Sequence, residues 1–354
     1  MNPTEGETDA LAEPVPGALG ERILLGHGSG GRLTADLFQG LFLPAFRSPQ
    51  LEVAADQALV ELGGATVAVT TDSFVVSPLF FPGGDIGRLA VCGTVNDLAV
   101  GGATPLYLTV GFILEEGLPV ADLRRIVASM AEAAREAGVT IVAGDTKVVE
   151  RGKGDGVFVN TTGVGLVPPG LRLSPRAIRP GDCILVSGPV GDHGVTIMAL
   201  RSGIGVEAGI RSDTAPLSGL VRALLDAVPG AVRCMRDPTR GGLATTLVEL
   251  ARAAGLCFQV EEAAIPVREE VRALCEMLGI DPLYVANEGK LVAIVDGAAA
   301  DAALAALRSH PLGREAQIIG RVASGPPGAV HLRTVVGGTR PLDLLEGEQL
   351  PRIC

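Results

Sequence analysis

The stretches Val167-Pro168-Pro169-Gly170 and Arg179-Pro180-Gly181 lie near the middle of the 354-residue chain and decide how it is divided. Proline fixes φ and lacks an amide hydrogen, and glycine favours turns, so these stretches interrupt helices and strands. Each flanking half is long enough for one domain. We therefore expect four parts along the chain: a disordered, acidic leader (1–20), an N-terminal domain (21–168), a C-terminal domain (169–336) and a mobile tail (337–354).

Hydrophobic periodicity predicts that both halves mix helices and strands. Apolar residues recur at helical spacing from 120 to 137, with Gly138 as a stop. Short β-branched or alternating runs predict strands in the first half at 65–71, 107–113, 140–143 and 157–167. The second half predicts strands at 183–187, 256–260 and 291–295 and near 318 and 330, and helices at 195–201, 217–227, 243–254, 267–278 and 298–308. The expected fold class is α+β, with two mixed α/β domains.

Composition and charge exclude several classes of protein. A hydrophobic content of 47% excludes wholesale disorder. The uncharged stretch Leu98–Leu114 contains glycine and proline and is too short for a membrane span, so we interpret it as a loop and a buried strand. The net charge of −11 disfavours nucleic acid and anionic membranes as partners. No signal peptide precedes the first domain, so we expect a cytoplasmic protein.

The six cysteines form no CxxC pair and have no histidine at zinc spacing. Five lie in apolar or strand-like surroundings and are predicted to be inert core thiols: Cys92, Cys183, Cys234, Cys257 and Cys275. Cys354 differs because it is the last residue. A terminal thiol on a flexible arm can enter an active site, receive a group and be presented elsewhere, although composition alone favours an accidental terminal residue.

The cluster Gly26-His27-Gly28-Ser29-Gly30-Gly31 satisfies the pattern GxGxxG, and helix-like sequence follows at 33–42. The pattern alone is weak, because the βαβ unit of a dinucleotide site does not follow it. Two interpretations remain: a surface turn, or a run of backbone amides that wraps phosphates. No GxxxxGK[ST] motif occurs, which excludes a Walker-type ATPase.

Four aspartates, Asp72, Asp97, Asp145 and Asp237, occur at predicted strand ends or in glycine-rich turns. For any one of them, a turn or a helix cap is the simpler role. Four in comparable settings favour magnesium, which takes carboxylates together with substrate phosphates. Magnesium would also let an acidic protein bind a nucleoside triphosphate.

Three other residues are candidates with simpler alternatives. Lys147 is placed to neutralise phosphate charge, and an exposed lysine is equally compatible. Glu288, just before a predicted strand, is a candidate general base or a solvated loop acid. His193, in Gly191-Asp192-His193-Gly194, is a ligand or a helix-capping histidine, and capping is favoured.

Taken together, these blocks resemble the HypE family of hydrogenase maturation factors from about Leu25 to the last residue. The most specific blocks are Gly144-Asp145-Thr146-Lys147 and Pro351-Arg352-Ile353-Cys354. The Asn96-Asp97 block also recurs in the wider aminoimidazole ribonucleotide synthetase-like (PurM-like) ATP enzymes. The leader has no counterpart in the resemblance.

The resemblance implies a PurM-like fold with an ATP cleft between the domains, a flexible C-terminal tail and a homodimer formed through the N-terminal domains. It implies that the carbamoyltransferase HypF places a carbamoyl group on Cys354. ATP then drives dehydration of that group to a thiocyanate, with ADP and phosphate as products. The cyanide passes to iron on the HypC–HypD scaffold, for nickel-iron hydrogenase. ATP and Mg²⁺ are the implied cofactors.

Roles for individual residues follow from the same resemblance. Cys354 would be the acceptor, Glu288 would take the proton and Lys147 would stabilise charge. Magnesium would be held by Asp72, Asp97, Asp145 and Asp237. Nucleotide contacts are expected from Gly28, Ser29, Gly30, Gly31, Asn96, Asp72, Asp97 and Asp145.

Two alternatives remain open. The first is a related enzyme, such as selenophosphate synthetase or thiamine monophosphate kinase. The glycine loop has His27 and Ser29 where selenophosphate synthetases typically carry a reactive Cys or Sec beside a Lys, which argues against that member. The second is a non-catalytic carrier that only presents Cys354, and intrinsic ATP hydrolysis separates it from an enzyme.

Overall fold

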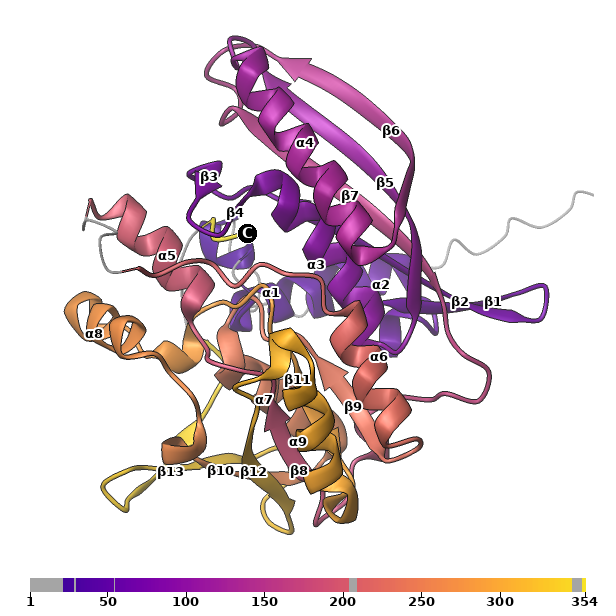
Figure 1. Cartoon of the computed structure of the whole chain (residues 1–354), viewed down its shortest axis with the longest axis vertical. Coiled ribbons are helices and arrows are strands. Elements are labelled where there is room, and N and C mark those ends of the chain that lie inside the picture. Colours follow the sequence, from indigo (N-terminus) through magenta and orange to yellow (C-terminus); the bar gives the residue numbers. More distant parts are fainter. Residues whose placement is uncertain (1–21, 29, 54, 204–208, 346–351) are drawn as a thin grey trace, which may run out of the picture.

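The computed structural model describes residues 22–28, 30–53, 55–203, 209–345 and 352–354. The chain forms two mixed α/β units, each built on its own sheet (Figure 1). The predicted leader, 1–20, lies outside the described residues. In the described part of the chain, no helix combines the length and apolar content needed to cross a membrane.

Five strands form the N-terminal sheet, in the order β1-β2-β7-β5-β6. Only β5 and β6 pair in parallel; the other neighbours are antiparallel. The helix α3 (Ile86–Val100) packs against β2, β5 and β7, and α4 (Val120–Ala137) packs on α3. The strands are β1 (Ala58–Leu62), β2 (Ala65–Phe74), β5 (Thr104–Glu115), β6 (Thr140–Val149) and β7 (Val157–Leu166), with a small hairpin of β3 (Phe80–Phe81) and β4 (Gly84–Asp85).

The helix α3 corrects the expectation of a loop at the start of the uncharged stretch. Asp85 caps it by accepting hydrogen bonds from the amides of Gly87 and Arg88, at 2.7 and 3.0 Å. Nearly every residue of α3 is buried, so the helix has no polar face and its sequence shows no 3.6-residue periodicity. Gly87 allows close packing on α4, because a Cβ there would lie 2.5 Å from the carbonyl oxygen of Ile126.

Seven strands form the C-terminal sheet, in the order β14-β13-β10-β12-β8-β11-β9. Only β10 and β13 pair in parallel. The strands are β8 (Cys183–Val186), β9 (Val232–Arg236), β10 (Cys257–Glu261), β11 (Val292–Val295), β12 (Gln317–Ala323), β13 (Val330–Arg333) and β14 (Thr339–Leu342). The helices are α5 (Asp192–Arg201), α6 (Ser218–Ala227), α7 (Gly242–Ala254), α8 (Glu269–Leu278) and α9 (Ala300–Ser309).

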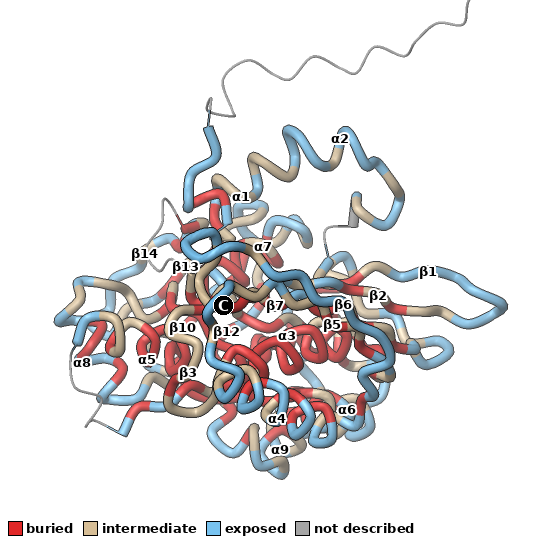
Figure 2. The backbone as a smooth tube through the Cα atoms, turned by 90° about the horizontal axis from the view of Figure 1, so that it is seen from above, coloured by how far each residue is buried: buried red, intermediate tan, exposed pale blue. Residues whose placement is uncertain are grey.

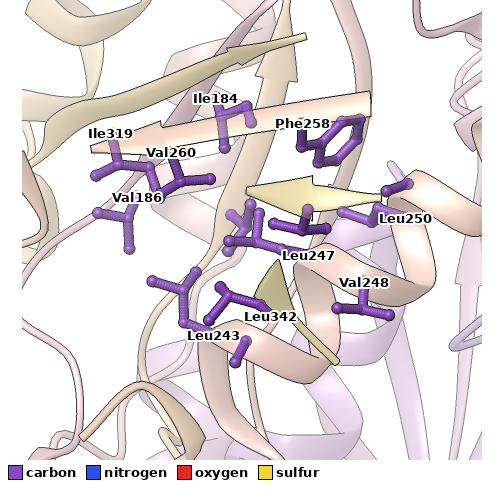
Figure 3. Packing of buried hydrophobic residues seen from close by; sticks show 14 of the residues in the cluster. Ile184, Val186, Leu243, Leu247, Val248, Leu250, Phe258, Val260, Ile319 and Leu342 are labelled. Carbon is purple, nitrogen blue, oxygen red and sulfur yellow. The ribbon is translucent and has the colours of Figure 1, made fainter. Parts of the chain in front are cut away.

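Helices cover both faces of the central strands of this sheet. Alternate residues of β8 pack on opposite sides: Ile184 joins α7 in one hydrophobic cluster, and Leu185 joins α6 and α9 in another. The buried members of the first cluster are aliphatic apart from Cys234 and the fully buried Phe258 (Figure 3). A strand buried on both faces reads as a continuous apolar run, which explains why 183–187 and 291–295 were predicted as strands.

Several other elements differ from the predictions. The strand β6 continues to Val149, so Asp145 and Lys147 lie within it rather than after it. The strands β1 and β9 were not predicted. The strand β14 lies inside the segment expected to be a mobile tail, where it pairs with β13. Near the N-terminus, α1 (Arg32–Leu37) continues through a π-helical turn into α2 (Leu43–Phe46), beyond the expected end at 42.

Candidate active site

A cavity of about 200 Å³ lies between the two domains. The N-terminal domain contributes residues of β2 and α3, and the C-terminal domain contributes the loop after β9 and the segment before β11. The last residue of the chain completes the wall, and Figure 1 shows the C-terminus between the domains, near β4 and α1. The lining acids and reactive groups are Asp56, Asp72, Asp97, Asp237, Glu249, Glu288, Arg236, Arg240 and Cys354.

Three carboxylates in this cavity lie close enough to share one ion. Oxygens of Asp56, Asp97 and Asp237 are within 4.8 Å of one another. Burial, followed by the charge of Asp56, raises the pKa of Asp237 to about 8. Burial and the charge of Asp237 raise the pKa of Asp97 well above its usual range. Burial and the neighbouring carboxylates therefore both disfavour the charged forms of these acids in the metal-free protein.

The surroundings hold these acids in place. The hydroxyl of Thr70 donates to Asp97 Oδ2 at 2.8 Å. Arg236 lies 2.9 Å from Asp56 and 3.3 Å from Glu249, so its positive charge neutralises part of the negative charge of these carboxylates. A compact set of hard oxygen ligands with excess negative charge fits a divalent cation such as Mg²⁺.

The cavity also holds a thiol and a carboxyl whose pKa values are both raised. Burial raises the pKa of the Cys354 thiol to about 12, although Arg240 opposes the shift. Burial and the charge of Asp237 raise the pKa of Glu288 well above its usual range. Glu288 Oε1 is buried without a hydrogen-bond partner, so this carboxyl is free to act on a group that enters the cavity.

The glycine loop lies against the same cavity. Gly30, at φ +78°, is part of the lining, and a Cβ there would lie 2.8 Å from Arg240 Cβ. Arg240 Nη1 donates to the carbonyl oxygen of Gly28 at 2.8 Å, which ties Gly28 to a residue that lines the cavity. Ser29 lies outside the described residues.

The structure brings together most, but not all, of the predicted residues. It places Asp72, Asp97, Asp237, Glu288, Cys354 and Gly30 on one cavity. Asp145 and Lys147 lie elsewhere: both are exposed on β6, where they pair with each other at 2.5 Å.

Asn96, predicted to contact the nucleotide, is buried in α3, and its side-chain amide hydrogen-bonds to backbone groups. Its Nδ2 donates to the carbonyl oxygens of Ala215 and Glu288 at 3.1 and 3.2 Å, and its Oδ1 accepts from the Leu217 amide at 2.8 Å. The side chain therefore joins the two domains in this structure.

Three residues at or near the cavity were missed or misread in the sequence. Asp56 has no sequence pattern of its own, and only the fold shows that it belongs with Asp97. Arg240 stands in the conspicuous Arg236–Gly242 block, which was a usable signal. His193 does not cap its helix: its ring is bonded to Ser212 Oγ and to the carbonyl oxygen of Ile353.

Comparison with known proteins defines the class first. Residues 54–167 match the family described as AIR synthase related protein, N-terminal domain, and residues 179–333 match the corresponding C-terminal domain. The matches fall on the two units of the fold, so this is a two-domain AIR synthase-related protein.

Closer relatives narrow the class. The carbamoyl dehydratase HypE of Azotobacter vinelandii is 62% identical over 328 residues, which cover 93% of this chain and 96% of that protein. A crystal structure of a HypE–HypF complex superposes with a TM-score of 0.83 at 47% identity, covering 87% of this chain and 99% of that one. A crystal structure of HypE in complex with ATP superposes with a TM-score of 0.79 at 51% identity, covering 94% of this chain and 100% of that one. The chain belongs to the HypE family.

Proposed function

We propose that this protein uses ATP to dehydrate a carbamoyl group on its own Cys354 to a thiocyanate. The observation that carries the proposal is that the Cys354 thiol shares one cavity with the acid cluster and Glu288. The names of its relatives, carbamoyl dehydratase HypE and HypE in complex with ATP, support the reaction class and the use of ATP.

The chemistry needs a better leaving group than an amide oxygen. Transfer of the γ-phosphoryl group of ATP to the thiocarboxamide oxygen makes that oxygen part of a phosphate. Breaking the C–O bond then releases phosphate, and loss of both N–H protons leaves S–C≡N on the protein. The balance is protein thiocarboxamide plus ATP giving protein thiocyanate, ADP, phosphate and a proton.

Residues of the cavity match these steps. Glu288 faces the cavity with an unpartnered oxygen, and its raised pKa makes its carboxylate a stronger base for the N–H protons. Arg240, whose charge interacts with Cys354, is placed to stabilise negative charge developing beside the sulfur. Gly30 of the glycine loop lines the cavity, and backbone amides of this loop would contact the phosphates.

Asp56, Asp97 and Asp237 would hold Mg²⁺, with Asp72 beside them. The fit rests on their mutual distances and on pKa values that burial and neighbouring carboxylates raise. When bound, the ion would neutralise phosphate charge and orient the nucleotide. Asp56 takes the place that the sequence assigned to Asp145.

A homodimer is part of the proposal. The strand β6 is an edge of its sheet and is exposed almost throughout (Figure 2). It leaves Ile141, Val142 and Val148 at 38, 56 and 66% exposure. An apolar, unpaired edge is typical of a protein–protein interface. Asp145 and Lys147 lie on the same strand, outside the cavity, so the nucleotide-binding roles that the resemblance implies for them stay predictions.

The partners follow the family. A HypE–HypF complex has been crystallised, and we propose that HypF carbamoylates Cys354 of this chain. Delivery of the cyanide to iron on HypC–HypD, for nickel-iron hydrogenase, completes the proposal. We place the reaction in the cytoplasm, where thiols stay reduced.

Intact-mass spectrometry tests the function. Carbamoylated protein given Mg-ATP should lose the mass of one water, localised to Cys354. Cys354→Ala should accept no carbamoyl group, whereas Asp97→Asn should be carbamoylated and then lose no water. The exposed Glu132→Gln is the matched control and should behave as wild type. A wild-type protein that is carbamoylated, hydrolyses no ATP and loses no water would be a carrier rather than a dehydratase.

A further inference from the structure

The last three residues are held in the cavity by contacts of different kinds. Two are backbone hydrogen bonds to the segment after β2: the Val75 amide donates to the Cys354 carbonyl oxygen at 3.0 Å, and the Ser77 amide donates to that of Arg352 at 3.4 Å. The Ile353 side chain is 3% exposed and packs in the core of the N-terminal domain. The two backbone hydrogen bonds use the N-terminal domain alone, whereas the cluster around Ile353 also includes Ile197 and Ala286 of the C-terminal domain.

The C-terminal domain adds two side chains of α5 to this set: Arg201, which donates to the carbonyl oxygen of Arg352, and His193. His193, in the first turn of α5, is completely buried. Its Nε2 lies 2.9 Å from the carbonyl oxygen of Ile353, and its Nδ1 lies 2.7 Å from Ser212 Oγ. Its ring packs edge-on against Phe81, with ring centroids 5.5 Å apart.

The partners of His193 determine which nitrogen carries the proton. A carbonyl oxygen only accepts, so Nε2–H is the donor to Ile353 and Nδ1 must accept from the Ser212 hydroxyl. Ser212 Oγ accepts in turn from the Thr214 amide at 3.2 Å, and the Thr214 hydroxyl lies 2.6 Å away. Burial lowers the pKa of His193, so the neutral ring that this chain of bonds needs is the form present at pH 7.

The chain of bonds also fixes the ring relative to both domains. Ser212 donates its amide to the Pro82 carbonyl oxygen at 2.8 Å, which ties its segment to the β3–β4 hairpin of the N-terminal domain. The His193 ring that contacts the tail is therefore held in a fixed orientation by Ser212. The carbonyl that the ring holds is in the residue next to Cys354, which lines the cavity together with Arg240 and Glu288.

We propose that His193, oriented by Ser212, is a positioning residue that holds the Ile353 carbonyl and so keeps the Cys354 thiol in the cavity. It touches no reacting atom. The holding role stands on the geometry alone, and its consequence for dehydration rests on the proposed function.

Alkylation of Cys354 in the full chain measures this role without ATP or a carbamoyl group. A seated thiol has its pKa raised to about 12 by burial and should react with iodoacetamide only when the tail leaves the cavity. Labelling is read by mass spectrometry of the C-terminal peptide, with Cys354→Ser as the background. Loss of one net hydrogen bond should raise the labelling rate about threefold to tenfold.

The variants separate the hydrogen bond from packing. His193→Phe keeps a ring and loses the donor, so it should label faster; His193→Gln keeps an N–H donor and should stay closer to wild type. Ser212→Ala removes the group that orients the ring and should label at an intermediate rate. The labelling rate of each variant is measured at the same number of degrees below its own thermal midpoint, so that differences in global stability do not enter the comparison.

Either of two results would overturn the role. One is wild-type labelling in His193→Phe; the other is equal acceleration in His193→Phe and His193→Gln, which would point to packing. If His193→Phe does not fold, Ser212→Ala decides, and wild-type labelling there overturns the proposal.

Carbamoylated protein links the role to the reaction. Single-turnover loss of water should slow in His193→Phe by about the factor seen in labelling, while the rate of carbamoylation, which uses the released tail, does not fall. Faster labelling in His193→Phe with no water loss even in wild type would leave the holding role intact and sink the proposed function. Faster labelling with an unchanged rate of water loss would overturn the link to catalysis.

Discussion

Replacing Asp237 with Asn should stabilise the metal-free protein while removing its response to Mg²⁺. Asp237 is 7% exposed, and burial together with the charge of Asp56 raises its pKa to about 8. At pH 7 the folded, metal-free protein therefore keeps a proton on Asp237 that the unfolded chain releases. An asparagine is neutral in both states, so folding of the variant does not require the free energy of protonating this residue at pH 7.

The magnitude follows from linkage. Holding a proton at pH 7 on a group whose unfolded pKa is about 3.9 costs about 1.4 kcal/mol for each of about three pH units, or about 4 kcal/mol. Neighbouring acids share the charge, so we expect a gain of about 2–4 kcal/mol. Between about pH 4 and about pH 8, the folded protein binds a proton on Asp237 that the unfolded chain does not. The free energy of unfolding of the metal-free protein should therefore fall as pH rises through this range, and Asp237→Asn should reduce that fall.

Urea unfolding at pH 5, 7 and 8, in EDTA and in excess MgCl₂, measures these effects. Wild type should gain stability from Mg²⁺ at pH 7 and 8, and Asp237→Asn should gain little. Glu132→Gln, on the exposed face of α4, should shift the free energy of unfolding by less than about 0.5 kcal/mol. The reasoning is refuted if Asp237→Asn unfolds at lower urea than wild type in EDTA, or if both proteins respond equally to Mg²⁺.

Three further predictions concern packing and the exposed strand. Gly87→Ala places a methyl group 2.5 Å from the Ile126 carbonyl oxygen, so α3 and α4 must separate; urea unfolding should show a loss of about 1–3 kcal/mol, and an unchanged midpoint would contradict the packing. Phe258→Ala should cost about 3–5 kcal/mol, because the ring is fully buried in the cluster of Figure 3, and a loss below 1 kcal/mol would mean that the cluster collapses around the gap. Lys147→Ala and Asp145→Asn should leave the urea midpoint unchanged, because this ion pair is exposed. If the two residues contact the nucleotide, both variants should bind ATP more weakly in calorimetry, and full ATP affinity in both would show that β6 is not part of the nucleotide site.

The helices best predicted from sequence are those that are buried on one side only. Residues 120–137 form α4 with the predicted bounds, because a helix with one solvent face alternates polar and apolar residues at 3.6-residue spacing. The helix α3 gave no such signal, since it is enclosed by the sheet and by α4. The five cysteines predicted to lie in the core are buried and unbridged, as their apolar surroundings in the sequence indicated.

Residue types and local order determined the kind of chemistry this protein can hold: aspartates for a metal, a glycine loop for phosphates, and a terminal thiol. Tertiary structure alone decided which of them meet. It joined Asp56 to Asp97 and Asp237, left Asp145 on an exposed strand, and set His193 against the tail. The physical reason is that sequence patterns report each residue's neighbours along the chain, whereas charge repulsion and hydrogen bonding in the cavity act between residues that only the packing of two domains brings within a few ångströms.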